Sequence, residues 1–182
     1  MKVWLVWTAA ALLSVERIAY ILIWRDPATF TSWSTRRAFA IAGGGPVDLL
    51  VVLFASFKVI QIAVFIAWHL AFGDGTLLPY SRDPAVVAAG AFFVGLGQGL
   101  NLSVFRRLGK VGVFYGNKFG HSVSWCRKFP FTWFEHPQYV GTALAIWGFF
   151  FAMRFPAPDW IVLPLLESVY YAVGARLERD PV

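Results

Sequence analysis

Cysteine is nearly absent from this sequence, since Cys126 is the only one among 182 residues. A single thiol excludes an internal disulfide framework. Recognisable nucleic-acid-binding motifs are also missing, so the net charge of +6 is better explained by contact with anionic lipid headgroups. The first segment, Val3–Trp24, lacks the small-residue cleavage site of a secretory signal peptide and is too long for its apolar part. We therefore expect this segment to remain as structure.

Hydrophobic residues, in contrast, make up 58% of the chain, and the mean hydropathy is +0.61. Soluble domains are closer to half apolar. The composition therefore predicts a single membrane domain over residues 1–182, an all-α integral membrane protein with four to five membrane helices. The expected helices are Val3–Trp24, Leu49–Phe72, Ala85–Phe105 and a closing helical hairpin of two shorter limbs, Gln138–Met153 and Trp160–Ala175.

Three charged residues interrupt the first two expected helices: Glu16 and Arg17 are adjacent in the first, and Lys58 lies in the second. Long charged side chains either reach back to the membrane surface or form a polar site that faces the interior of the bundle, and both arrangements remain open here. Between these helices, Arg25–Asp48 is expected to be a loop. The three glycines at 43–45 do not follow a strand, so they indicate a hinge rather than a dinucleotide-binding fingerprint.

The distribution of basic residues predicts the topology. Most of them fall in Arg25–Asp48, in Arg106–Pro137 and in the tail that begins at Arg176. Positive charge concentrates on the cytosolic loops of membrane proteins. With the amino terminus outside, these three segments face the cytosol together, provided that both limbs of the closing hairpin cross the membrane.

A proline-bent polar stretch, Phe129–Gly141, precedes the closing hairpin. Pro130 and Pro137 hold their preceding residues away from helical backbone, and Pro137 suits the first turn of a helix. Glu135 and His136 therefore lie at a helix start, beside free backbone N–H groups that can bind anions. Taken alone, the stretch is equally well explained as a helix cap at the membrane interface.

Glycines and acidic residues elsewhere add to this pattern. Gly95 and Gly99 form a small-xxx-small pattern that is typical of helix packing. Glu167 and Glu178 are separated by about three helical turns and would share one face of a continuing helix. Together with the basic segments and the proline-bent stretch, these residues indicate a cytosol-facing pocket with room for a flat cofactor.

A series of short segments has a specific order and spacing. They are Gly95-Leu96-Gly97, Leu102-Ser103, Phe105, Leu108-Gly109, Gly116, Phe119-Gly120, Phe129-Pro130-Phe131, Pro137-x-Tyr139-x-Gly141 and the acidic tail before Pro181. In this pattern the chain resembles the phosphatidylethanolamine N-methyltransferase family of membrane phospholipid methyltransferases, with a core signature over residues 95–182. The same proline–tyrosine–glycine form also occurs in isoprenylcysteine carboxyl methyltransferases. A carboxyl methyltransferase of that kind and a non-enzymatic helical membrane protein are therefore the two alternatives.

The resemblance implies that S-adenosylmethionine methylates the amine of phosphatidylethanolamine, or of its mono- and dimethyl derivatives, leading to phosphatidylcholine without a metal. It implies that the cofactor is bound by a glycine motif and by an acidic pair near the carboxy terminus. In this chain the motif is Gly95, Leu96 and Gly97. The acidic pair falls on Arg179 and Asp180, with Glu178 one place earlier. Either Glu178 substitutes for the missing acid, or the cofactor is held differently.

The resemblance also suggests the remaining roles. The candidates that accept or orient the proton of the amine are Glu135, His136 and Tyr139. The candidates that hold the lipid phosphate are Arg106, Arg107 and Lys110. The expected partner is a phospholipid in the bilayer, with no nucleic acid and no indication of an oligomer. The endoplasmic reticulum membrane, with the site facing the cytosol, is the first expectation for location, and a mitochondria-associated or bacterial inner membrane also fits.

Overall fold

The structure, a computed structural model, describes residues 3–124 and 126–178. Within this part of the chain every regular element is a helix, which confirms the all-α prediction. The elements are α1 (Val3–Arg25), α2 (Pro27–Ser34), η1 (Arg37–Ala42), α3 (Pro46–Phe72), α4 (Pro84–Val113), η2 (Gly116–Phe119), α5 (Pro137–Arg154) and α6 (Val162–Leu177).

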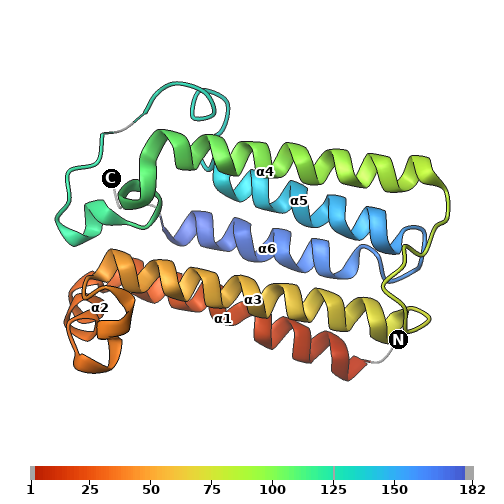
Figure 1. Cartoon of the computed structure of the whole chain (residues 1–182), viewed down its shortest axis with the longest axis horizontal. Helices are drawn as coiled ribbons and strands as arrows, with labels where there is room; N and C mark the ends of the chain where they lie inside the picture. Colours follow the sequence, from red (N-terminus) through yellow and green to blue (C-terminus); the bar gives the residue numbers. More distant parts are fainter. Residues whose placement is uncertain (1–2, 125, 179–182) are drawn as a thin grey trace.

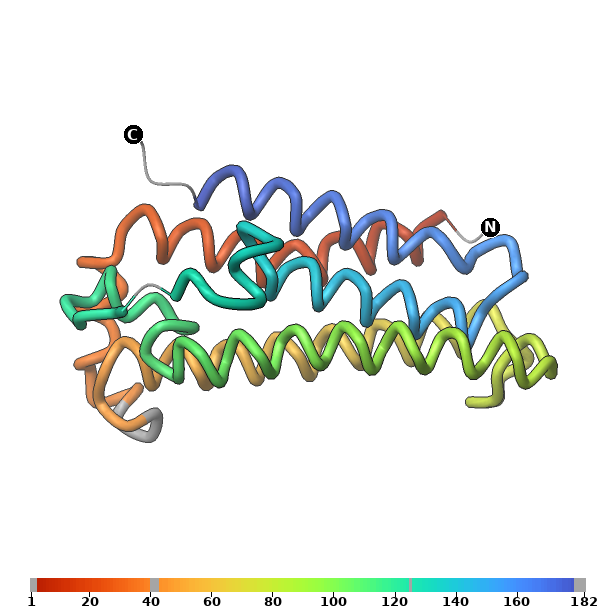
Figure 2. Tube along the Cα trace, turned by 90° about the horizontal axis from the view of Figure 1, so that it is seen from above, coloured from red at the N-terminus to blue at the C-terminus, as the bar shows by residue number. Residues whose placement is uncertain are grey.

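The five long helices run side by side along one axis, each antiparallel to the one before it in the chain (Figures 1 and 2). α4 packs along α5, while α1 contacts both α3 and α6. One end of the bundle collects α2, η1, η2, the start of α5 and the end of α6 (Figure 1). We call it the basic end, because the segments 25–48, 106–137 and 176–178 meet there, as the charge distribution predicts.

Three helices, α1, α3 and α4 with its extension to Phe119, are long and apolar enough to cross a membrane. The protein is therefore an integral membrane protein. α5 and α6 have 18 and 16 residues, which correspond to about 27 and 24 Å of helix. They form the expected hairpin, and their full passage across the bilayer stays a prediction.

Helix boundaries differ from the predicted ones at the basic end. The prediction of a loop over Arg25–Asp48 is wrong, because α2 and η1 lie within it. Asp26 caps α2 by accepting a hydrogen bond from the Thr29 backbone nitrogen at 3.0 Å, and Pro27 occupies the first turn. α4 also continues past the predicted end at Phe105, with non-helical backbone only at Gly109, where φ is 64°.

Close packing of α4 on α5 depends on glycines two turns apart. A Cβ atom at Gly97 would lie 2.3 Å from the Gly141 carbonyl oxygen, and one at Gly90 would lie 2.6 Å from the Gly148 carbonyl oxygen. The expected packing pair was Gly95 with Gly99. That prediction is wrong by about half a helix turn, because Gly95 lies on the side of α4 away from α5. A Cβ at Gly95 would meet nothing within 4 Å.

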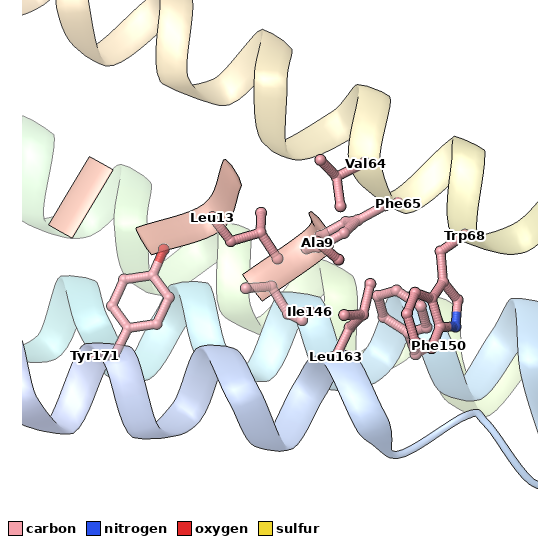
Figure 3. Close-up of a cluster of buried hydrophobic side chains, with 9 residues drawn as sticks. All are labelled: Ala9, Leu13, Val64, Phe65, Trp68, Ile146, Phe150, Leu163 and Tyr171. Carbon is pink, nitrogen blue, oxygen red and sulfur yellow. The ribbon is translucent and has the colours of Figure 1, made fainter. Parts of the chain in front are cut away.

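The apolar core joins α1, α3, α5 and α6 (Figure 3). It consists of Ala9, Leu13, Val64, Phe65, Trp68, Ile146, Phe150, Leu163 and Tyr171. At the far end, Arg154 is 1% exposed and donates to both carboxylate oxygens of Asp159, at 3.0 and 2.6 Å. Arg154 also donates to the Phe72 carbonyl oxygen at 2.8 Å. These hydrogen bonds connect the turn between α5 and α6 to the end of α3. They lie at the end of the bundle opposite to the basic end.

Candidate active site

A small polar cavity of about 60 Å³ lies inside the bundle toward the basic end, and we call it the polar chamber. Helices α1, α3, α5 and α6 contribute to its wall, together with the end of α4 and the residues before η2. Its lining residues are Glu16, Arg17, Tyr20, Leu50, Phe54, Lys58, Val113, Phe114, Tyr115, Gln138, Tyr139, Thr142 and Tyr171.

A larger cavity of about 840 Å³ lies between α3, α4 and α5, and we call it the apolar groove because most of its lining is hydrophobic. Along α3 it runs from Phe54 to Ile66, about 18 Å of helix. The chamber and the groove share six lining residues: Phe54, Lys58, Val113, Phe114, Gln138 and Thr142. The polar chamber therefore lies directly beside an apolar groove that runs parallel to the helices.

Glu16, Arg17 and Lys58 form a linked network in the chamber. Arg17 donates to Glu16 at 2.8 Å, and Lys58 lies 3.2 Å from the same carboxylate oxygen. Lys58 also donates to Gln61 at 3.0 Å and lies 3.4 Å from the Tyr171 hydroxyl. Glu16 and Arg17 are only 5% and 6% exposed. Of the two arrangements that the sequence leaves open, the polar site facing the bundle is the observed one.

Two further carboxylates lie on the inner face of the last helix and its cap. Gln61 donates to Glu167 at 2.7 Å, and the Tyr139 hydroxyl donates to Glu178 at 2.5 Å. Both glutamates are buried in the bundle, although α6 ends at Leu177, one residue before Glu178. Burial raises the pKa of the Glu178 carboxyl above its usual value, although the hydrogen bonds from Tyr139 and Tyr115 offset part of the rise.

Several polar atoms around the chamber have no hydrogen-bond partner within the described part of the chain. They include Nε and Nη1 of Arg17, the Tyr20 hydroxyl and Oε1 of Glu178. The Arg17 guanidinium instead lies over the Tyr171 ring, 4.2 Å from its centroid. Buried groups of this kind are usually satisfied. Unpaired donors and an unpaired carboxylate oxygen around one cavity fit bound groups of both negative and positive charge.

The three candidates for proton transfer occupy different environments. Tyr139 lines the chamber, and the His136 ring stacks on it with centroids 5.7 Å apart. Glu135 is exposed, and its carboxylate lies 3.9 Å from His136 Nε2. The structure therefore brings Tyr139 into the site, places His136 behind it and leaves Glu135 at the surface.

The predicted glycine motif lies on α4 outside both cavities. Gly97 is buried against α5, whereas Gly95 and Leu96 are exposed. At the other predicted cofactor element, Glu178 reaches the chamber through Tyr139. Arg179 and Asp180 lie outside the described residues.

The predicted phosphate ligands lie on the outside of the basic end. Arg106 and Arg107 are exposed on α4, and Lys110 forms an ion pair with Asp48. None of the three lines the polar chamber or the apolar groove.

Sequence reasoning missed three of the chamber's four tyrosines, Tyr20, Tyr115 and Tyr171. Tyr20 lies one helical turn after Glu16, so its spacing could have placed it on the same face. Tyr115 has no such signal, because it follows the end of α4 in left-handed backbone, with φ 55°. Tyr171 similarly follows Glu167 by one turn.

These features define a helical integral membrane protein in which an interior polar chamber adjoins an apolar groove. A family model described as phospholipid methyltransferase matches residues 85–180. The chain therefore belongs to the phospholipid methyltransferase family.

Two relatives have names that bear on the activity. The phosphatidyl-N-methylethanolamine N-methyltransferase of Arabidopsis thaliana is 42% identical over 50 residues, which is 28% of this chain and 30% of the relative. The human phosphatidylethanolamine N-methyltransferase is 32% identical over 97 residues, 53% of this chain and 48% of the relative. The matched parts thus span less than half of either relative's length. No solved structure matches this chain.

Proposed function

We propose that this protein uses S-adenosylmethionine to methylate the amine of phosphatidylethanolamine, or of its mono- and dimethyl derivatives, on the way to phosphatidylcholine. The observation that carries the proposal is the wall of six residues that the polar chamber shares with the apolar groove. A phospholipid needs both environments at once. Its acyl chain fits an apolar wall about 18 Å long along α3, and its headgroup fits a chamber lined by carboxylates and tyrosines. The names of the two relatives support the same acceptor class.

Of the residues that would hold the cofactor, Glu178 lies at the basic end. Glu178 has an unpaired carboxylate oxygen beside the chamber, so it is the described member of the acidic tail that suits this role. Arg179 and Asp180 keep the role proposed for them from the sequence. In the glycine motif only Gly95 and Leu96 present a free surface, because Gly97 is covered by α5. S-adenosylmethionine supplies the activated methyl group when it is bound.

Methyl transfer needs a neutral amine, so the acceptor ammonium must first lose a proton. Tyr139 and Glu178 form the pair best placed to take it. The Tyr139 hydroxyl already donates to Glu178, so it can pass its own proton to the carboxylate while it accepts one from the amine. A carboxyl whose pKa is raised by burial is a stronger base than an exposed glutamate. His136 stacks on Tyr139 and orients its ring.

Product analysis tests the proposal. The purified protein is placed in lipid nanodiscs with labelled S-adenosylmethionine and with phosphatidylethanolamine, its monomethyl or its dimethyl derivative in turn. Label in the phospholipid amine is the expected result, and the three acceptors show which methylation steps occur. Label in a prenylcysteine methyl ester instead would identify a carboxyl methyltransferase. Absence of S-adenosylmethionine binding would support a packing protein without this activity.

The proposed location is the endoplasmic reticulum membrane, with the basic end in the cytosol. The cytosol contains S-adenosylmethionine, and the basic end carries the segments that the positive charges assign to that side. Glu178 and Tyr139 would then lie on the side from which the methyl donor arrives.

A further inference from the structure

Two positive side chains, Arg17 and Lys58, line the interior cavity within helices long enough to cross the membrane. Cations at such positions are costly and commonly mark functional sites. Both lie outside residues 85–180, the part matched by the family model. The match to the family therefore does not extend to either of them.

The electrostatic pairing inside the chamber does not use all of their donors. Glu16 contacts both cations, but Nε and Nη1 of Arg17 remain without a partner in the described structure. Glu167 is engaged by Gln61, and Glu178 by Tyr139. A buried N–H without an acceptor costs about 1–3 kcal/mol. An anionic ligand that enters the chamber would recover this loss.

The position of Lys58 indicates which anion that is. Its side chain lines both the polar chamber and the apolar groove and is one quarter exposed, whereas Arg17 lines only the chamber. Positive charge therefore lies where the groove meets the chamber. In a phospholipid the phosphodiester occupies the corresponding place, between the acyl chains and the amine.

We infer that Lys58 and Arg17 form the binding subsite for the phosphodiester of the acceptor lipid, an inference that rests on the proposed function. Lys58 contacts the phosphate where the chamber meets the groove, and the unpaired nitrogens of Arg17 donate hydrogen bonds to it from inside the chamber. Lys58 and Arg17 thus take the phosphate-binding role that the sequence suggested for Arg106 and Arg107, which are exposed and line neither cavity. The amino-terminal half of the chain then selects phospholipids, and the carboxy-terminal half provides the Tyr139–Glu178 pair.

The test compares two acceptors in mixed micelles. One is dioctanoyl phosphatidylethanolamine, and the other is a dioctanoyl amino-lipid in which an ether replaces the phosphodiester. Wild-type protein should favour the phospholipid in kcat/KM. The variant Lys58→Gln should lose about 10-fold or more of that preference, mainly through a higher KM, because a charge-assisted contact to phosphate is removed. Its affinity for S-adenosylmethionine should match that of the wild type.

Arg17→Gln provides a second measurement and should lower the same preference. This variant also removes a partner of buried Glu16. Its affinity for S-adenosylmethionine is therefore measured first, and an affinity equal to that of the wild type shows that the site is intact. The exposed double variant Arg106→Gln/Arg107→Gln is the matched control and should keep the preference.

Three results would overturn the inference. An unchanged preference in Lys58→Gln means that this lysine does not recognise phosphate. Loss of S-adenosylmethionine affinity with the preference intact assigns the subsite to the carboxylate of the methyl donor instead. If the wild type methylates neither lipid, the proposed function itself has failed.

Discussion

The Tyr139 hydroxyl connects the proline-bent stretch to the carboxy-terminal acid. Its ring is held between His136 and Tyr171, with centroid distances of 5.7 and 5.4 Å. Its hydroxyl donates to Glu178 across 39 residues of sequence. A single oxygen atom therefore joins the start of α5 to the end of α6, at the wall of the chamber.

Removal of that oxygen is the most direct change at the residue scale. Tyr139→Phe keeps the aromatic packing but breaks the proposed proton path, so kcat should fall about 100-fold. The loss of one hydrogen bond should lower the free energy of unfolding by only about 1 kcal/mol. Methyl transfer and thermal unfolding in detergent measure the two effects separately.

Tyr170→Phe is the matched control for this change. Tyr170 donates to the Ala10 carbonyl oxygen at 3.0 Å and does not line the chamber. It should show a similar loss of stability with nearly normal kcat. Equal losses of kcat in the two variants would assign Tyr139 a purely structural role.

The raised pKa of Glu178 predicts a particular pH dependence. The proposed role requires the carboxylate form, so activity should fall as the pH drops through the pKa of Glu178. Because burial raises that pKa above the ordinary 4.5, the fall should begin at a higher pH than for an exposed glutamate. Initial rates at saturating substrates across pH 5–9 measure it.

Stability should respond in the opposite direction. A raised pKa means that folding favours protonated Glu178, so this contribution to stability is present at low pH and is lost as the pH rises through the folded-state pKa. Glu178→Gln should therefore stabilise the protein more at pH 8 than at pH 5 while it lowers activity. A variant that loses activity but gains no stability at pH 8 would contradict the burial of an ionised carboxylate.

At the scale of elements, the contact between α4 and α5 sets the geometry of the site. α5 begins at Pro137, so its packing on α4 places Gln138, Tyr139 and Thr142 at the chamber. The approach is close enough that glycines on each helix face the backbone of the other. Side chains at these positions would separate the helices and widen the junction of chamber and groove.

Gly97→Leu should therefore destabilise the fold by more than about 3 kcal/mol, since the new side chain has no room beside Gly141. Gly95→Leu is its matched partner on the same helix and should leave thermal unfolding nearly unchanged, because its Cβ meets nothing within 4 Å. If Gly95 contributes to cofactor binding, this variant should still lose S-adenosylmethionine affinity. Equal stability of the two variants would contradict the helix contact.

At the scale of the whole molecule, the single cysteine offers a test of orientation. Cys126 is partly exposed in the connection between η2 and α5, which belongs to the basic end. A membrane-impermeant maleimide applied to sealed vesicles from cells should label it only when the cytosolic face is outside. Thr76→Cys in a Cys126→Ser background is the control, since residue 76 lies between α3 and α4 at the opposite end. If both cysteines were labelled from the same face, the chain would cross the membrane an even number of times between residues 76 and 126. That result would contradict the alternating arrangement of the helices.

The patterns that depend on local chemistry could be predicted from the sequence. Apolar runs predicted the long helices because a membrane-spanning segment must satisfy its own backbone hydrogen bonds. Basic loops predicted which connections share one end of the bundle. The family resemblance of the proline-bent stretch and the tail suggested Tyr139 and Glu178 as candidate site residues, and the structure brings these two side chains together.

Contacts between helices could not be predicted in the same way. The rotation of α4 about its axis decides that Gly97 packs on α5 while Gly95 is exposed. The spacing of the glycines in the motif does not specify which face of α4 is turned toward α5. Burial of Glu16, Arg17 and Lys58 likewise depends on how α1 and α3 are turned toward each other. The sequence by itself determined the all-helical membrane class and the charged end, since these follow from composition along the chain. Only the tertiary structure decided which polar residues meet in the chamber, because distant segments share a site only after the helices have packed.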